Sequence, residues 1–217
     1  MQRVSILSDG SVPRRILALG AHADDIEIGC GGTLLRLLAE RPGTEVHWAV
    51  FCATPERERE ARASAAAFLR DAGRSTVDVL GHRDGFLPYS GAAVKDAFEE
   101  LKRRFTPDLV LTHHRHDLHQ DHRLVSELTW NTWRDHLVLE YEIPKYDGDL
   151  GAPNFFCPLP AATLERKVAL VLEHFRSQAG KHWFTPELFR ALPRIRGMEC
   201  VAPEGVAEAF YCRKAVF

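Results

Sequence analysis

Residues 15–51 read RILALGAHADDIEIGCGGTLLRLLAERPGTEVHWAVF, and this stretch decides the fold. It begins with the apolar run 15–20, continues with leucines at helical spacing over 31–40, and ends with a second apolar run, 45–51. This order is typical of a strand–helix–strand unit with parallel strands. The chain is therefore expected to begin with a β–α–β unit.

The same alternation continues along the chain. Further helices are predicted over 55–72, 94–105, from about 124, over 163–179 and over 186–192, and further strands over 77–80, 109–112 and 138–143. This rhythm predicts the α/β class, with a Rossmann-like doubly wound, mostly parallel sheet and helices on both faces. The Pro- and Gly-rich stretch 144–160 is expected to be an active-site loop. No boundary divides the chain, so 1–217 is expected to form a single domain.

Composition excludes several classes of function. The chain is 45% hydrophobic and 27% charged with a formal charge of -2, which is ordinary for a globular protein and argues against nucleic acid as a partner. No apolar run has the roughly 18 residues of a membrane span, and the N-terminus shows no secretory signal. The five cysteines are scattered, which favours reduced thiols and a cytoplasmic location.

Two polar segments follow predicted strands. AHADD (21–25) comes after the first strand, and HHRHDLHQDH (113–122), with five of the chain's 11 histidines, comes after the strand at 109–112. Histidine interleaved with carboxylates suits zinc or a similar divalent ion. In open α/β sheets, sites form where loops converge outside the carboxyl ends of the strands. The sequence therefore predicts one metal site at this edge.

Each segment alone also has other interpretations. Acidic residues in 21–25 can cap a helix, and this alternative remains open for that segment by itself. A phosphate-binding interpretation of the following glycines is disfavoured, because GxxxxGK[ST] is missing and two carboxylates would repel a phosphate. The HxHxDH pattern of the metallo-β-lactamase fold is also disfavoured, because Asp117 stands at its first position.

Together the segments resemble a known family. AHADDIEIGCGGTL (21–34) is similar to the (A/P)HPDDxExGCGGTL signature of the LmbE/PIG-L-like zinc-dependent N-deacetylases, and HDLHQDH (116–122) is similar to their xDxHPDH signature. Ala23 and Gln120 replace the usual prolines, which affects loop stiffness more than chemistry. The resemblance extends along nearly the whole chain and includes GHRDGFLP (81–88).

The resemblance implies His22, Asp25 and His122 as metal ligands, with one Zn²⁺ per chain or another divalent ion such as Fe²⁺. It implies Asp24 as the general base. It also implies that His119, as an imidazolium held by Asp121, stabilises the oxyanion. Three further residues are expected to contact the substrate: Arg57, Arg59 and Asp84.

The resemblance thus implies a hydrolase, a metal-dependent amidohydrolase that removes an N-acetyl or other N-acyl group from an amino sugar or sugar conjugate and releases acetate. Its expected partner is a small N-acetylated sugar, and a homo-oligomer is compatible with the sequence. Two alternatives remain open. One is a metal-dependent hydrolase of another bond, such as a phosphoester. The other is a non-catalytic metal- or sugar-binding member of the fold.

Overall fold

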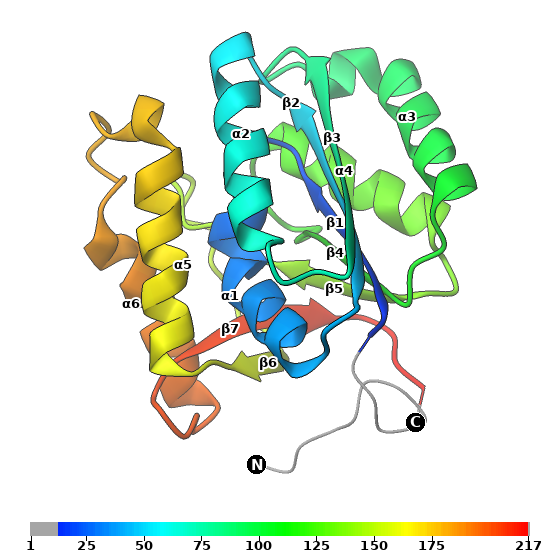
Figure 1. The fold of residues 1–217 in the computed structure, drawn as a ribbon. Coiled ribbons are helices and arrows are strands. Elements are labelled where there is room, and N and C mark those ends of the chain that lie inside the picture. Colours follow the sequence, from blue (N-terminus) through cyan, green and yellow to red (C-terminus); the bar gives the residue numbers. More distant parts are fainter. Residues whose placement is uncertain (1–12, 217) are drawn as a thin grey trace.

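The computed structural model describes residues 13–216, and a seven-stranded sheet forms its centre (Figure 1). The strands are β1 (Arg15–Gly20), β2 (Glu45–Cys52), β3 (Arg74–His82), β4 (Leu109–His113), β5 (Leu137–Tyr141), β6 (Phe155–Pro158) and β7 (Ala207–Cys212). Their order across the sheet is β3-β2-β1-β4-β5-β7-β6. The first five are parallel, β7 is antiparallel to β5, and β6 is antiparallel to β7. The prediction about a secretory signal falls mainly on residues outside the described range.

Helices cover both faces of this sheet. They are α1 (Asp25–Glu40), α2 (Pro55–Phe68), α3 (Gly91–Arg104), α4 (Gln120–Thr132), α5 (Ala161–His174) and α6 (Pro186–Glu199), with short 3₁₀ turns η1 (Leu87–Ser90) and η2 (Arg176–Gln178). Helices α1, α2 and α5 lie on one face, and α3 and α4 lie on the other (Figure 1). Helix α6 packs against α5 and β7. The predicted fold class is therefore confirmed.

Strand β1 shows why the sheet needs helices on both sides. Ile16 and Ala18 point into the core beneath α1, α2 and α5, whereas Leu17 and Leu19 point into the core beneath α3 and α4. All four are fully buried. A strand that is apolar on both faces is stable only where both faces are covered, as in parallel α/β sheets.

The glycines of α1 serve close packing. A Cβ atom at Gly29 would overlap the ring of Tyr141 on β5, and one at Gly31 would lie 2.6 Å from Cε1 of Phe68 on α2. Any larger residue would therefore push α1 away from its neighbours. The helix also begins at Asp25, earlier than the predicted range 31–40, so the acidic pair lies at its N-terminus.

Two strands and the end of one helix also differ from the predictions. Strand β6 lies inside 144–160, which had been predicted to be a loop, and β7 was not predicted. These two strands pair with each other at one end of the sheet. Their strand conformation depends on this pairing more than on the local sequence of either short segment. Helix α6 continues through Pro193 to Glu199, whereas the prediction ended it at residue 192. Arg196, in the added turn, forms a buried ion pair with Glu142, and such a tertiary contact overrides local propensity.

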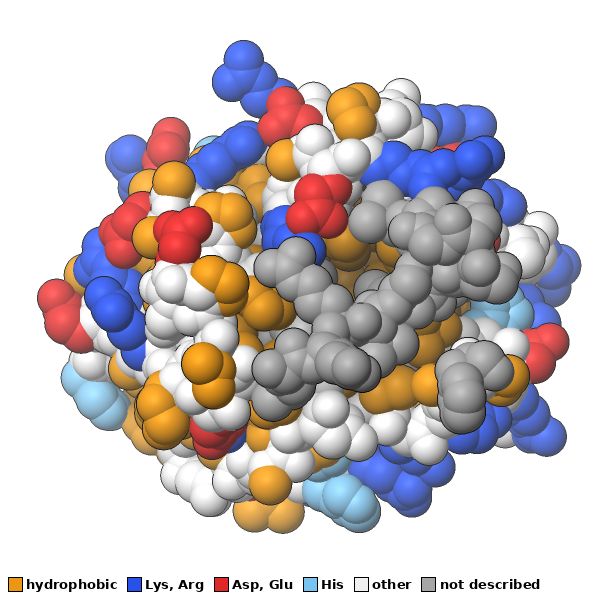
Figure 2. Space-filling model, turned by 90° about the horizontal axis from the view of Figure 1, so that it is seen from below, with side chains coloured by type: hydrophobic (Ala, Val, Ile, Leu, Met, Phe, Trp, Pro, Cys, Tyr) orange, Lys and Arg blue, Asp and Glu red, His pale blue; other side chains and the backbone are white. Residues whose placement is uncertain are grey.

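The surface carries both signs of charge. Seen from below, acidic and basic side chains are spread around the rim of the face with hydrophobic side chains between them (Figure 2). This distribution agrees with the formal charge of -2. Within residues 13–216, no helix is long and apolar enough to cross a membrane.

Candidate active site

The two polar segments meet at the carboxyl edge of the sheet. Strand β1 ends at Gly20 and β4 ends at His113, and the two strands are parallel neighbours. The residues that follow them therefore leave the sheet at the same edge. His22 and His122, 100 residues apart in the chain, have a Nδ1-to-Nε2 distance of 3.1 Å.

Three donor atoms form a compact triangle in this cluster. Nδ1 of His22 lies 3.1 Å from Nε2 of His122 and 3.3 Å from Oδ2 of Asp25. Nε2 of His122 lies 3.5 Å from the same carboxylate oxygen. Ligands of a tetrahedral zinc ion are separated by ~3.4 Å, given bonds of about 2.0–2.1 Å. Two imidazole nitrogens and a carboxylate oxygen at these separations fit a divalent ion such as Zn²⁺ or Fe²⁺.

Carboxylates fix the orientation of His22. Its Nε2 atom lies 3.0 Å from Oδ1 of Asp84 and 3.2 Å from Oδ2 of Asp121. The carboxylate of Asp121 also accepts hydrogen bonds from the backbone N–H groups of Gly85 and Leu87, at 2.7 and 3.1 Å. A proton on Nε2 satisfies these acceptors and leaves Nδ1 free to bind a metal, which is how outer carboxylates select the tautomer of a ligand.

A second carboxylate orients His122. Nδ1 of His122 lies 2.9 Å from Oδ2 of Asp117, and Nζ of Lys145 lies 2.9 Å from the same oxygen. Lys145 is also paired with Asp149. Burial lowers the pKa of His122 to about 4, so its imidazole is neutral and can act as a ligand near neutral pH.

His119 caps the N-terminus of α4. Its Nδ1 atom accepts a hydrogen bond from the backbone N–H of Asp121 at 3.3 Å, and burial lowers the pKa of His119. Both features favour a neutral ring with its proton on Nε2. The resemblance implied an imidazolium held by Asp121, but the contact here is made by the Asp121 backbone. The carboxylate of Asp121 instead faces His22.

Asp24 is paired with an arginine. Its Oδ2 atom lies 2.8 Å from Nη2 of Arg57, on the first turn of α2. Arg57 is held in turn by Glu60 at 2.9 Å, by the Ser177 hydroxyl at 3.3 Å, and by the ring of Phe175 beneath its guanidinium. Burial raises the pKa of Asp24, and the Arg57 charge acts in the opposite direction.

A cavity of about 990 Å³ opens over this cluster. The predicted metal ligands line it together with Asp24 and His119, whereas Asp121 is fully buried behind them. Of the predicted substrate contacts, Arg57 and Asp84 line the cavity. Arg59 is exposed on α2 and is not among the lining residues.

Two residues of the site were missed by sequence reasoning, and the role of a third, Asp117, was left undetermined. His113 is fully buried, stacks on His122 with ring centroids 3.9 Å apart, and accepts a hydrogen bond at Nε2 from the Ala21 N–H. Its place directly after the predicted strand at 109–112 was a usable signal. Lys145 was missed because its sequence context, a Pro- and Gly-rich loop, carries no ligand pattern.

Fold and site together define an α/β protein with a candidate metal centre at the carboxyl edge of a parallel sheet. A family model described as PIG-L: GlcNAc-PI de-N-acetylase matches residues 17–133, more than half of the chain. The chain belongs to this family. The match contains both polar segments, so it covers every ligand candidate.

Solved structures share the fold over nearly the whole chain. The conserved protein TT1542 from Thermus thermophilus is 25% identical with a TM-score of 0.71, and the match covers 93% of this chain and 95% of that one. N,N'-diacetylchitobiose deacetylase from Pyrococcus horikoshii is 22% identical with a TM-score of 0.70, covering 91% and 83%. GalB, the 4-carboxy-2-hydroxymuconate hydratase of Pseudomonas putida, is 17% identical with a TM-score of 0.73, covering 94% and 98%. No curated protein matches in a sequence search.

The shared fold does not by itself decide the reaction. A deacetylase and a hydratase both have this fold, so the reaction must be argued from the residues of the site.

Proposed function

We propose that this chain is a metal-dependent amidohydrolase that removes the N-acetyl group of an amino sugar or sugar conjugate and releases acetate. The observation that carries the proposal is the triangle of donor atoms from His22, Asp25 and His122, beside a carboxylate, Asp24, that takes no part in the triangle. Family membership supports the same reaction.

The triangle would hold one divalent ion, with Zn²⁺ as the first candidate. Such an ion would supply positive charge that polarises the amide carbonyl and makes a nearby water a stronger nucleophile. Asp117 holds the His122 ring through its Nδ1 atom, and Asp121 holds the His22 ring through its Nε2 atom. Both imidazoles thereby keep the orientation that a metal site requires. Three protein ligands leave a coordination position open, as in catalytic rather than structural zinc sites.

Asp24 is the proposed general base. It takes a proton from the attacking water and delivers it to the leaving amine, so that the C–N bond breaks to give the free amine and acetic acid, which then loses its proton to solvent as acetate. His119 is the proposed oxyanion donor, because the hydrogen bond at Nδ1 leaves the Nε2 proton free to face the carbonyl oxygen. Arg57 and Asp84 line the cavity and are candidates to bind sugar hydroxyls.

The decisive experiment measures acetate release from a panel of N-acetylated sugars, with metal content determined on the same sample. We expect release that a chelator abolishes and that one equivalent of Zn²⁺ or Fe²⁺ restores. Two bound ions with phosphoester cleavage would support the alternative hydrolase. Bound metal without turnover of any sugar or phosphoester would support a non-catalytic binder.

A further inference from the structure

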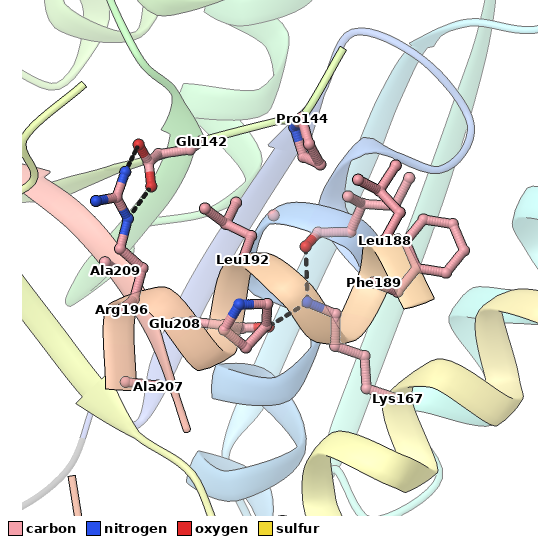
Figure 3. Close-up of a pocket in the computed structure, with 13 residues that line it drawn as sticks. Glu142, Pro144, Lys167, Leu188, Phe189, Leu192, Arg196, Ala207, Glu208 and Ala209 are labelled. Carbon is pink, nitrogen blue, oxygen red and sulfur yellow. Dashed lines mark hydrogen bonds and ion pairs between the residues drawn. The ribbon is translucent and has the colours of Figure 1, made fainter. Parts of the chain in front are cut away.

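A buried ion pair lies beside helix α1, outside the candidate active site. Nζ of Lys167 on α5 lies 2.6 Å from Oε1 of Glu208 on β7, and both side chains are buried. Figure 3 shows Lys167 reaching from α5 to Glu208, and the two residues line a small pocket together with Arg196 and Glu142. Both members of the pair lie beyond residues 17–133, the part of the chain that the family model matches. The C-terminal elements therefore bring a charged pair to α1.

Both members of this pair bind the backbone of α1. Lys167 donates to the carbonyl of Ile28 at 2.7 Å. Glu208 accepts from the N–H of Gly32 at 2.9 Å and from the N–H of Thr33 at 2.6 Å. In an uninterrupted helix, the N–H of Gly32 donates to the carbonyl of Ile28. The ion pair thus binds both the donor and the acceptor of one hydrogen-bond position of the helix.

Gly32 allows the carboxylate to come this close. A Cβ atom at Gly32 would lie 2.9 Å from Oε1 of Glu208 and 2.6 Å from Cδ1 of Leu159. Gly32 belongs to GCGGTL (29–34), the part of the first motif to which the proposed mechanism gives no role. The absence of a side chain at this position opens the backbone of α1 to a side chain from β7.

We propose that Lys167 and Glu208 are positioning residues for the first turn of α1. This turn carries the proposed general base, Asp24, and the proposed metal ligand, Asp25, so the inference rests on the proposed function. The N–H of Ile28 donates to the carbonyl of Asp24 at 2.9 Å. The residue whose carbonyl Lys167 holds therefore closes the turn that carries both carboxylates.

The metal triangle tolerates little movement of this turn. Oδ2 of Asp25 lies 3.3 Å from Nδ1 of His22 and 3.5 Å from Nε2 of His122, close to the ~3.4 Å expected between ligands of a tetrahedral ion. A misplacement of about 1 Å can cost roughly 100-fold in rate. At Gly29, α1 also rests on the ring of Tyr141. Contacts with β5, β7 and α5 therefore fix α1 within about two turns of its start.

Stability alone does not require this pair. Apolar side chains in place of Lys167 and Glu208 would leave the N–H of Gly32 free to donate within α1, as in an ordinary helix. Replacing a buried ion pair by apolar residues of similar volume is often neutral or stabilising, because burial of the charges costs them their hydration. What the pair adds is a fixed position of α1 relative to β7 and α5.

The test uses Lys167→Met/Glu208→Met, a double variant that removes both charges and keeps a similar side-chain volume. We expect its urea midpoint to be no lower than that of the wild type. In the folded protein, Zn²⁺ should bind about tenfold more weakly, and kcat for acetate release should fall by about tenfold with KM within about threefold. The matched control is Arg36→Met/Glu40→Met, which removes an ion pair farther along α1 and should keep wild-type values.

A second variant, Gly32→Ala, keeps both charges but pushes the Glu208 carboxylate away from the backbone of α1. It should also weaken Zn²⁺ binding and lower kcat, and it decides the question if the double variant does not fold. A lower urea midpoint in the double variant, with wild-type Zn²⁺ affinity and kcat in both variants, would overturn the proposal, because the pair would then contribute to stability alone. If the wild type turned over no N-acetyl sugar, the proposed reaction would fail, whereas the Zn²⁺ affinities would still test the positioning of Asp25.

Discussion

The guanidinium of Arg57 lies 2.8 Å from the carboxylate of Asp24, at the edge of the cavity that holds the candidate metal ligands. Arg57 is anchored in turn by Glu60 and Ser177, so the position of the Asp24 carboxylate depends on helix α2 and on the segment after α5. The sequence predicted Arg57 as a substrate contact. In the structure Arg57 instead forms an ion pair with Asp24, the proposed general base.

Arg57→Met should therefore lower kcat by about 10- to 100-fold, because a carboxylate displaced by 1 Å is a poor base. Metal content should be unchanged, since Arg57 does not contact the donor atoms of the triangle. The matched control is Arg59→Met, on the exposed face of the same helix, which should behave as wild type. Equal kcat in the two variants would contradict a positioning role for Arg57.

Asp24→Asn should lower kcat by about 10²- to 10⁴-fold, the usual contribution of a general base. The amide keeps the shape of the side chain but cannot accept the proton. Metal binding, measured by titration of the stripped protein, should stay within a fewfold of wild type. Retained turnover in this variant would remove Asp24 from the mechanism.

Asp117→Asn should weaken metal binding by about 10- to 100-fold, because Asp117 orients His122 from behind. The same change at Asp149 is the control. Asp149 also pairs with Lys145 and accepts from the backbone N–H of Leu118, but it has no contact with His122. Competition with a zinc-sensitive dye gives the affinities. Equal metal affinities in the two variants would mean that Asp117 does not affect metal binding by His122.

Glu27 makes stability depend on pH. Its carboxyl group is buried, and this burial raises its pKa to about 8. A carboxyl that stays protonated in the fold but ionises when unfolded destabilises the fold as pH rises. Between the unfolded pKa near 4.5 and the folded pKa near 8, the free energy of unfolding should fall by roughly 1 kcal/mol per pH unit.

Glu27→Gln should remove this slope and make the metal-free protein more stable than wild type at pH 8. Urea unfolding of both proteins at pH 5, 6.5 and 8 measures the effect. The control is Glu56→Gln, an exposed position on α2, which should keep the wild-type slope. If the free energy of unfolding changed with pH in the same way for the Glu27 variant and for wild type, Glu27 would be ionised in the folded protein.

The sequence by itself determined the class of fold, because its signals are local. Alternating apolar runs and amphipathic segments predict a parallel sheet with helices on both faces, and strands β1, β2, β4 and β5 lie close to the predicted ranges. The position of 21–25 and 113–122 after two of these strands also predicted that the segments would meet. Parallel strands place their carboxyl ends at one edge, so this inference needs only the topology.

Only the tertiary structure decided the contacts that tune the site. The pairing of Arg57 with Asp24, the link from Lys145 through Asp117 to His122, and the burial of His113 depend on contacts between separate helices, strands and loops. Strands β6 and β7 likewise form by pairing with each other. Local sequence carries propensity and spacing, whereas the orientation of a side chain and the pKa of a buried group depend on neighbours that folding supplies.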